Sequence, residues 1–133
     1  MKIYWSDGVV ISDGQEKITF DPRRKIEGSV TFITHAHGDH VFGFSNPGRK
    51  CSTKQTADLY HAGNGRRPKD HRSLQYGETL KLDTCRVQSL NAGHILGSTQ
   101  YKIETSEGVV VYTGDMNLQE SLLTSPAEIE DTD

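Results

Sequence analysis

The chain has 133 residues, of which 33% are hydrophobic and 25% are charged, and its formal net charge at pH 7 is -3. Its length suits one domain, since domains usually hold about 50–200 residues, and no run reaches the roughly 18 apolar residues of a membrane span. The start of the chain lacks a signal-peptide core and the negative balance argues against an indiscriminate nucleic-acid binder, so we expect a cytoplasmic protein with no membrane partner.

The first part of the chain predicts short strands separated by turns that contain glycine. Strands are expected at Lys2–Trp5, Val9–Ile11, Glu16–Phe20, Ser29–Thr34 and Lys50–Thr53. The fourth run is apolar and β-branched, which suits a buried strand. The aromatic side chains in or beside these strands are expected to pack in the core: Tyr4, Trp5, Phe20 and Phe32.

The middle of the chain predicts one helix and a basic loop. The helix is expected over Lys54–Ala62, with Thr53 as its cap and Gly63 ending it, and an exposed loop follows over Asn64–Ser73. Further strands are expected at Thr79–Leu82, Cys85–Leu90, Gln100–Thr105 and Val109–Thr113. These elements predict an α+β fold, in which a strand-rich sandwich layer carries few helices.

Cysteine and charge distribution add two expectations. Cys51 and Cys85 are the only cysteines and form no CxxC pair, so we expect two reduced thiols packed in strands. Lysine and arginine concentrate between Arg49 and Arg72. A basic segment of this kind can face phosphates, and a solvated loop explains the same run without any ligand.

The most informative segment is THAHGDH, residues 34–40. It follows an apolar strand and so lies at that strand's carboxyl end, where open sheets place their sites. If the strand continues through His37, then His35 and His37 point to the same side and can bind one ion. A turn eased by the glycine brings Asp39 and His40 beside them. Imidazole and carboxylate groups are donors that Zn(II) prefers, so the segment predicts a metal site.

Two later segments extend this candidate site. His94 stands in a loop bracketed by glycines, and Asp115 comes just beyond a hydrophobic strand. Either residue alone is ordinary, since a turn or a cap explains it. Each follows a strand end, as His35 does, so we expect all of them to meet at one rim. Ser98 can either hydrogen-bond a ligand or cap its own loop.

The order HxHxDH, then GHILGS, then GD after a strand resembles the metallo-β-lactamase fold. The form Gly93–Ser98 resembles the β-CASP branch of nucleic-acid-processing enzymes, in particular archaeal mRNA 3′-end processing factors and ligase-associated exonucleases. The resemblance extends from the first hairpin to Asp115. It implies an αββα sandwich, of which residues 1–133 form the strand-rich amino-terminal part of an apparently truncated domain. The implied enzyme is a zinc-dependent hydrolase, and the isolated chain is expected to be incomplete and inactive by itself.

The resemblance also implies a set of metal ligands. The family pattern falls on His35, His37, Asp39, His40, His94 and Asp115. The first two histidines and His94 would share one ion, Asp39 and His40 would hold a second, and Asp115 would bridge the two. Two divalent ions, zinc, are implied, with a bridging hydroxide as nucleophile. Asp39 and Asp115 are the implied catalytic carboxylates, and Asp39 would orient the water or take its proton.

The implied substrate is RNA or single-stranded DNA, cleaved by hydrolysis in RNA processing or DNA repair. Basic side chains are predicted to hold the nucleic-acid backbone near the rim: Arg66, Arg67, Lys69 and Arg72. Two alternatives stay open, a metallo-hydrolase of a small thioester or lactone and a non-catalytic subunit of a processing complex. The expected protein partners are the missing carboxyl-terminal half or a second copy of the chain.

Overall fold

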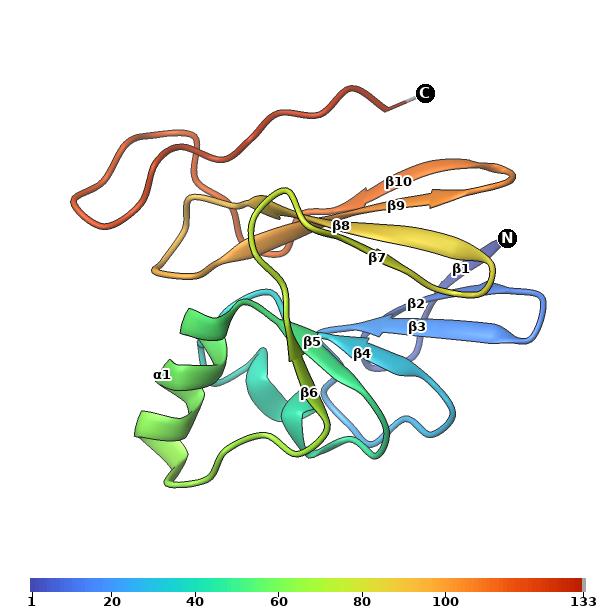
Figure 1. Cartoon of the computed structure of the whole chain (residues 1–133), viewed down its shortest axis with the longest axis horizontal. Coiled ribbons are helices and arrows are strands. Elements are labelled where there is room, and N and C mark those ends of the chain that lie inside the picture. The colour runs from blue at the N-terminus through green and yellow to red at the C-terminus, as the bar shows by residue number, and fades with distance from the viewer. Residues whose placement is uncertain (133) are drawn as a thin grey trace.

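The computed structural model describes residues 1–132, which form two packed β-sheets with one α-helix (Figure 1). The first sheet has its strands in chain order: β1 (Lys2–Trp5), β2 (Val9–Asp13), β3 (Glu16–Phe20), β4 (Val30–Phe32), β5 (Lys50–Ser52) and β6 (His71–Ser73). Neighbours from β1 to β3 pair antiparallel, and neighbours from β3 to β6 pair parallel. The carboxyl ends of β3 to β6 therefore share one edge.

The second sheet is antiparallel throughout. It contains β7 (Thr79–Lys81), β8 (Cys85–Asn91), β9 (Thr99–Thr105) and β10 (Gly108–Tyr112), in the order β10-β9-β8-β7. A 3-10 helix, η1 (Val41–Ser45), and the helix α1 (Lys54–Asn64) lie on the face of the first sheet turned away from the second (Figure 1). The predicted α+β fold, strand-rich and with few helices, is confirmed.

The main core lies between the sheets and is built around aromatic rings. The Phe20 and Phe32 ring centroids are 5.4 Å apart, and the Tyr101 ring of the second sheet meets Phe32 at 5.0 Å. The buried Tyr101 hydroxyl donates to the Ile33 carbonyl at 2.9 Å, so its polar end is satisfied across the interface. A smaller cluster of Ile33, Phe44 and Ala57 packs η1 and α1 against the outer face.

Several sequence predictions need correction. Tyr4 and Trp5 are 42% and 61% exposed, because all of β1 is an exposed edge strand, whereas Phe20 and Phe32 are buried as expected. The helix continues to Asn64, because the left-handed residue that ends it is Gly65 (φ 70°). The predicted basic loop contains β6, which pairs with β5. Both cysteines are free and buried in strands, as predicted.

The shared edge also gathers loops from the second sheet. The Thr99 N–H donates to the Thr34 carbonyl at 2.8 Å, which ties the start of β9 to the segment after β4. Gly114, after β10, has a φ of +55°, and a Cβ there would lie 2.8 Å from Thr34 side-chain atoms. Only glycine allows this approach without strain.

Among the described residues, 1–132, none of the helices has the length and apolar character that a membrane span requires.

Candidate metal centre

The segment after β4 brings His35 and His37 together without being a continuous strand. The strand ends at Phe32 rather than running through His37, and a turn closed by the His40 N–H on the His37 carbonyl (3.0 Å) follows. His35 Nε2 and His37 Nδ1 nevertheless lie 3.1 Å apart. The predicted pairing is therefore present, although the strand itself ends before these residues, at Phe32.

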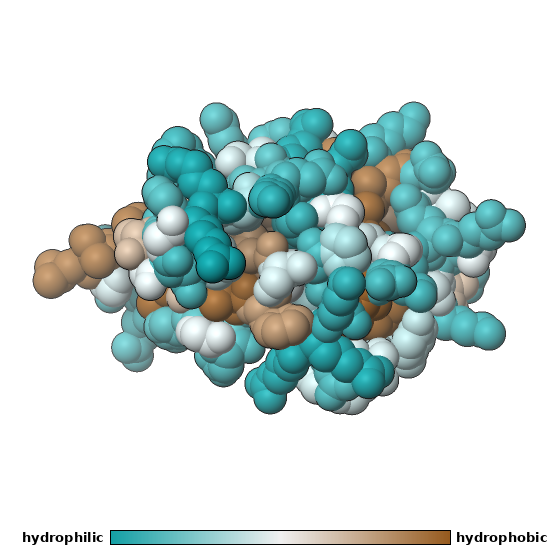
Figure 2. Space-filling view, turned by 90° about the horizontal axis from the view of Figure 1, so that it is seen from below, coloured by the Kyte–Doolittle hydropathy of each residue, from teal (hydrophilic) through white to brown (hydrophobic). Residues whose placement is uncertain are grey.

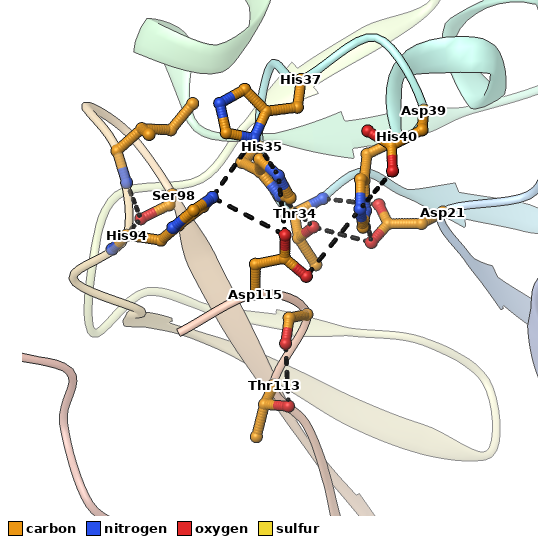
Figure 3. A network of polar contacts seen from close by, with 12 residues as sticks. Asp21, Thr34, His35, His37, Asp39, His40, His94, Ser98, Thr113 and Asp115 are labelled. Atoms are coloured by element: carbon orange, nitrogen blue, oxygen red, sulfur yellow. Dashed lines mark hydrogen bonds and ion pairs between the residues drawn. The ribbon is translucent and has the colours of Figure 1, made fainter. Parts of the chain in front are cut away.

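Four side chains converge at this edge (Figure 3). One ligand atom from each of His35, His37, His94 and Asp115 lies within 4.8 Å of all the others. His94 Nε2 is 3.2 Å from His37 Nδ1, and Asp115 Oδ2 is 3.7 Å from Nε2 of both His35 and His94. Bonds of 2.0–2.1 Å to a tetrahedral zinc ion put neighbouring ligand atoms about 3.3 Å apart. The donor types and their spacing therefore fit a divalent cation.

His40 and Asp39 lie beside this cluster, on the other side of Asp115. His40 Nε2 is 3.9 Å from Asp115 Oδ1 and 3.6 Å from Asp39 Oδ2. The two oxygens of Asp115 thus face different groups, Oδ2 toward the three histidines and Oδ1 toward His40. The Asp39 side chain is 66% exposed, so it borders the solvent. Donor atoms therefore lie on both sides of the Asp115 carboxylate.

Asp21 is a site residue that the sequence reasoning missed. It follows β3, is buried, and has a positive φ of 43°. Its carboxylate accepts hydrogen bonds from the Thr34 N–H (2.8 Å), the Thr34 hydroxyl (2.7 Å), His40 Nδ1 (2.9 Å) and the Tyr112 hydroxyl (3.2 Å). The signal in the sequence is an aspartate directly after β3, the strand that pairs with β4, and β4 precedes the THAHGDH segment.

These contacts fix which ring nitrogens are free. An ionised carboxylate only accepts, so His40 Nδ1 carries the proton given to Asp21 and leaves Nε2 facing Asp39 and Asp115. The Thr34 hydroxyl gives its proton to Asp21, so its oxygen accepts from His35 Nδ1 at 2.9 Å. His35 Nε2 therefore presents a lone pair to the cluster. Such outer contacts orient metal-binding imidazoles.

The pKa shifts at the site differ in direction between its two imidazoles His35 and His40. Burial, with the nearby His40 charge as a second cause, lowers the pKa of His35 to about 4. The hydrogen bond to Asp21 raises the pKa of His40. A backbone hydrogen bond lowers the pKa of Asp39, which keeps that carboxylate charged at neutral pH. His35 is thus a neutral donor at neutral pH.

The buried His35 gives a prediction for stability against pH in the metal-free chain. Its folded pKa lies below the ordinary 6.5, so unfolding takes up a proton, and stability is lost as pH falls from 6.5 toward 4. The contribution reaches at most about 3 kcal/mol. His40, with a raised pKa, acts in the opposite direction, losing its contribution to stability as pH rises.

We expect His35→Gln to reduce the loss of unfolding free energy between pH 7 and pH 4.5, measured by urea unfolding. An acid loss equal to that of the unaltered chain would contradict this assignment.

The loop that carries His94 is held by Ser98. Ser98 Oγ accepts from the His94 N–H at 3.0 Å and from the Ile95 N–H at 3.2 Å, so this serine caps its own loop. Gly93 has a φ of +67°, and a Cβ there would lie 2.5 Å from the Asn117 carbonyl oxygen. The glycines therefore allow the close backbone packing that places His94 opposite His37.

The structure does not bring the predicted basic side chains to the rim. Arg66, Arg67 and Lys69 lie between α1 and β6, before the first residue of β6, whereas the metal cluster follows the last residue of the parallel strand β4. Arg67 pairs with Asp58 (3.5 Å), and Arg72 pairs with Glu78 (3.2 Å). The prediction that these four bases hold nucleic acid beside the metal centre is therefore wrong. Arg66, Arg67 and Lys69 lie at the opposite end of the parallel strands, and Arg72 lies within β6.

Two proteins similar in sequence to this chain carry nuclease names. No family model matches it. The 5′ exonuclease Apollo of Mus musculus is 34% identical over 134 residues, which cover 92% of this chain and 25% of Apollo. RNase aCSPSF2 of Saccharolobus solfataricus is 47% identical over 58 residues, covering 44% of this chain and 12% of that protein. The chain thus spans a quarter or less of either relative.

Similarity in three dimensions extends to distant proteins. A metallo-β-lactamase with a HARLDQ motif from Cronobacter sakazakii superposes with a TM-score of 0.63 at 17% identity. The match covers 79% of this chain and 51% of that one. At this identity the likeness concerns the fold alone, and it supports the two-sheet arrangement described above.

Proposed function

The chain belongs to the metallo-β-lactamase superfamily and is homologous to its β-CASP nucleases, and on that premise we propose that it is the metal-binding part of a zinc-dependent phosphodiesterase. The substrate class is RNA or single-stranded DNA, the reaction is hydrolysis, and the context is RNA processing or DNA repair. Residues 1–133 would correspond to the amino-terminal part of the metallo-β-lactamase domain.

The single observation that carries the proposal is the position of Asp115 between two groups of donors. His35, His37 and His94 would hold one ion with Oδ2 of this carboxylate, and His40 with Asp39 would hold a second beside Oδ1. The distances of 3.6–3.9 Å between carboxylate oxygens and imidazole nitrogens leave room for cations between them. When bound, such ions polarise a phosphate oxygen and lower the pKa of water toward about 7.

The chain's own side chains contribute orientation and a proton acceptor. Asp21 and Thr34 hold the imidazoles of His35 and His40 with their free nitrogens toward the centre. Asp39 is charged at neutral pH and exposed to solvent, so its carboxylate can orient an attacking water or accept its proton. Asp39 and Asp115 are therefore the proposed catalytic carboxylates.

The direct test is hydrolysis of labelled single-stranded RNA, single-stranded DNA and a thioester reporter by the zinc-loaded protein that joins this chain to its carboxyl-terminal part. We expect cleavage of at least one nucleic acid, and loss of that cleavage in His94→Asn. The matched control is His61→Asn, because His61 lies on α1 outside the cluster. Turnover of the thioester alone would refute the nuclease proposal. Zinc binding without any turnover would favour the non-catalytic subunit.

A further inference from the structure

A polar pocket lies at the end of the first sheet opposite the candidate metal centre, where β5 and β6 begin. It has a volume of about 400 Å³ and is bordered by the segment between η1 and β5 and by the loop between α1 and β6. At this edge the Lys50 N–H, at the first residue of β5, donates to the Asp70 carbonyl at 2.9 Å. The helix α1, 11 residues or roughly 16 Å long, runs from the metal-centre edge back to this one.

Lys50 is the unusual residue of this pocket. It is only 3% exposed, and its ammonium donates to the Asn46 carbonyl at 2.9 Å. Within residues 1–132, no carboxylate lies within ion-pair distance of this ammonium, although the group has three N–H donors. Burial lowers the pKa of Lys50, with Asp70 opposing the effect. A buried cation without a counter-ion is costly, so an anion in the pocket would stabilise it.

The remaining walls add positive charge. Arg66, Arg67 and Lys69 also line the pocket, and Asp70 is the one acid among its lining residues. Arg67 is partly neutralised by Asp58 at 3.5 Å, whereas Arg66 and Lys69 have no ion pair within residues 1–132. In Figure 1 this loop lies at the bottom of the molecule, and the view from below is predominantly hydrophilic (Figure 2). The pocket is therefore a concave cationic site on an accessible face.

The pocket also carries an aromatic ring. Tyr60 of α1 lines it and packs on Phe44, with ring centroids 4.5 Å apart. Cations that follow a backbone, combined with an aromatic ring, are the usual features of sites for single-stranded nucleic acid. We propose that this pocket binds a phosphate group of the substrate strand at a point remote from the metal centre. The identity of the strand rests on the nuclease function proposed above, whereas the affinity for phosphate does not.

The test measures binding of a fluorescent 20-nucleotide single-stranded RNA to the metal-free chain at several salt concentrations. Arg66→Ala/Lys69→Ala should weaken binding about tenfold at low salt and reduce the salt slope by about 1.4, since each phosphate contact on a single strand contributes about 0.7. Asp70→Asn should strengthen binding, and asparagine suits its φ of 46°. The matched control is Lys81→Ala/Arg86→Ala, which removes the same charge from exposed positions of β7 and β8.

The outcomes separate the sources of phosphate and the two proposals. Equal weakening by the pocket variant and the control would overturn the inference, because it would show general electrostatic attraction. Binding of inorganic phosphate that depends on the pocket, with no effect on RNA binding, would overturn the assignment to a strand, as would preference for polyglutamate over RNA. In the zinc-loaded protein that joins this chain to its carboxyl-terminal part, a small phosphodiester reporter, too short to reach the pocket, should be hydrolysed equally with and without the pocket substitutions. Failure of that hydrolysis with intact pocket effects would refute the nuclease function and leave the phosphate site standing.

Discussion

Replacing Asp115 with asparagine is expected to lower the affinity of the chain for zinc by at least about 100-fold and, in the protein that joins this chain to its carboxyl-terminal part, to abolish hydrolysis. The physical reason is that its two carboxylate oxygens face separate donor groups, Oδ2 toward His35 and His94 and Oδ1 toward His40. An amide offers one neutral oxygen and a nitrogen that repels a cation. Metal content after dialysis against a weak chelator, measured with the cleavage rate, checks this.

The control for Asp115→Asn is Asp83→Asn, because Asp83 is an exposed carboxylate in the turn between β7 and β8. The control should keep its zinc and its activity. If Asp115→Asn retained zinc and activity at the level of this control, the bridging role would be wrong.

Removing the Asp21 carboxylate should produce the second large effect, on the fold of the site itself. Asp21→Ala leaves donors of Thr34, His40 and Tyr112 without their acceptor in a buried position. Breaking such a buried charged network costs about 3–5 kcal/mol. Alanine is also strained at the φ of 43°, whereas Asp21→Asn keeps the size and tolerates this conformation and should lose less. Urea unfolding of the metal-free chain measures both differences.

The same variants report on orientation as well as stability. In the unaltered chain the Nδ1 proton of His40 is held by Asp21, so a slowly exchanging imidazole N–H signal is expected by NMR. This signal should disappear in Asp21→Ala, which removes the acceptor, and should persist in Asp21→Asn, whose amide oxygen can still accept from His40 Nδ1. The exposed control Asp83→Ala should change the free energy of unfolding by less than about 0.5 kcal/mol. An Asp21→Ala chain that unfolds within about 1 kcal/mol of the unaltered one would contradict the role of Asp21.

The sequence was most informative where local pattern and chemistry coincide. The donors of THAHGDH lie close together in the sequence, between His35 and His40, so their proximity in space follows from local geometry. His94 and Asp115 could be assigned to the same edge because each follows a strand end, and the structure brings both to His35. Strands with alternating or continuous apolar residues could also be predicted, because a buried strand requires apolar side chains at regular positions.

Features that depend on tertiary pairing could not be predicted in this way. Asp21 resembles an ordinary strand-ending residue before proline, and its role exists only because Thr34, His40 and Tyr112 converge on it. The strand β6 contains exposed polar residues, and only its parallel pairing with β5 defines it. The exposure of Trp5 follows from the edge position of β1, which the local sequence does not show.

The position of the basic loop illustrates a further limit. Arg66 and Lys69 are distant from the metal motif both in sequence and in space. The reason is that α1 runs from the carboxyl ends of the parallel strands back to their amino ends. A run of basic residues in the sequence does not show at which end of the parallel strands those residues lie. The structure supplied that information and led to the phosphate pocket at the far edge.

The central claim is that side chains from three separate stretches bind the same cation, and a zinc titration of the metal-free chain followed by imidazole NMR tests it most directly. The account predicts that the ring signals of His35, His37 and His94 shift together and stop shifting at the same zinc equivalent, while His61 and His71, which lie on α1 and β6, stay unchanged. Zinc that shifts His61 or His71 instead, or leaves His94 unaffected while His35 responds, would contradict it.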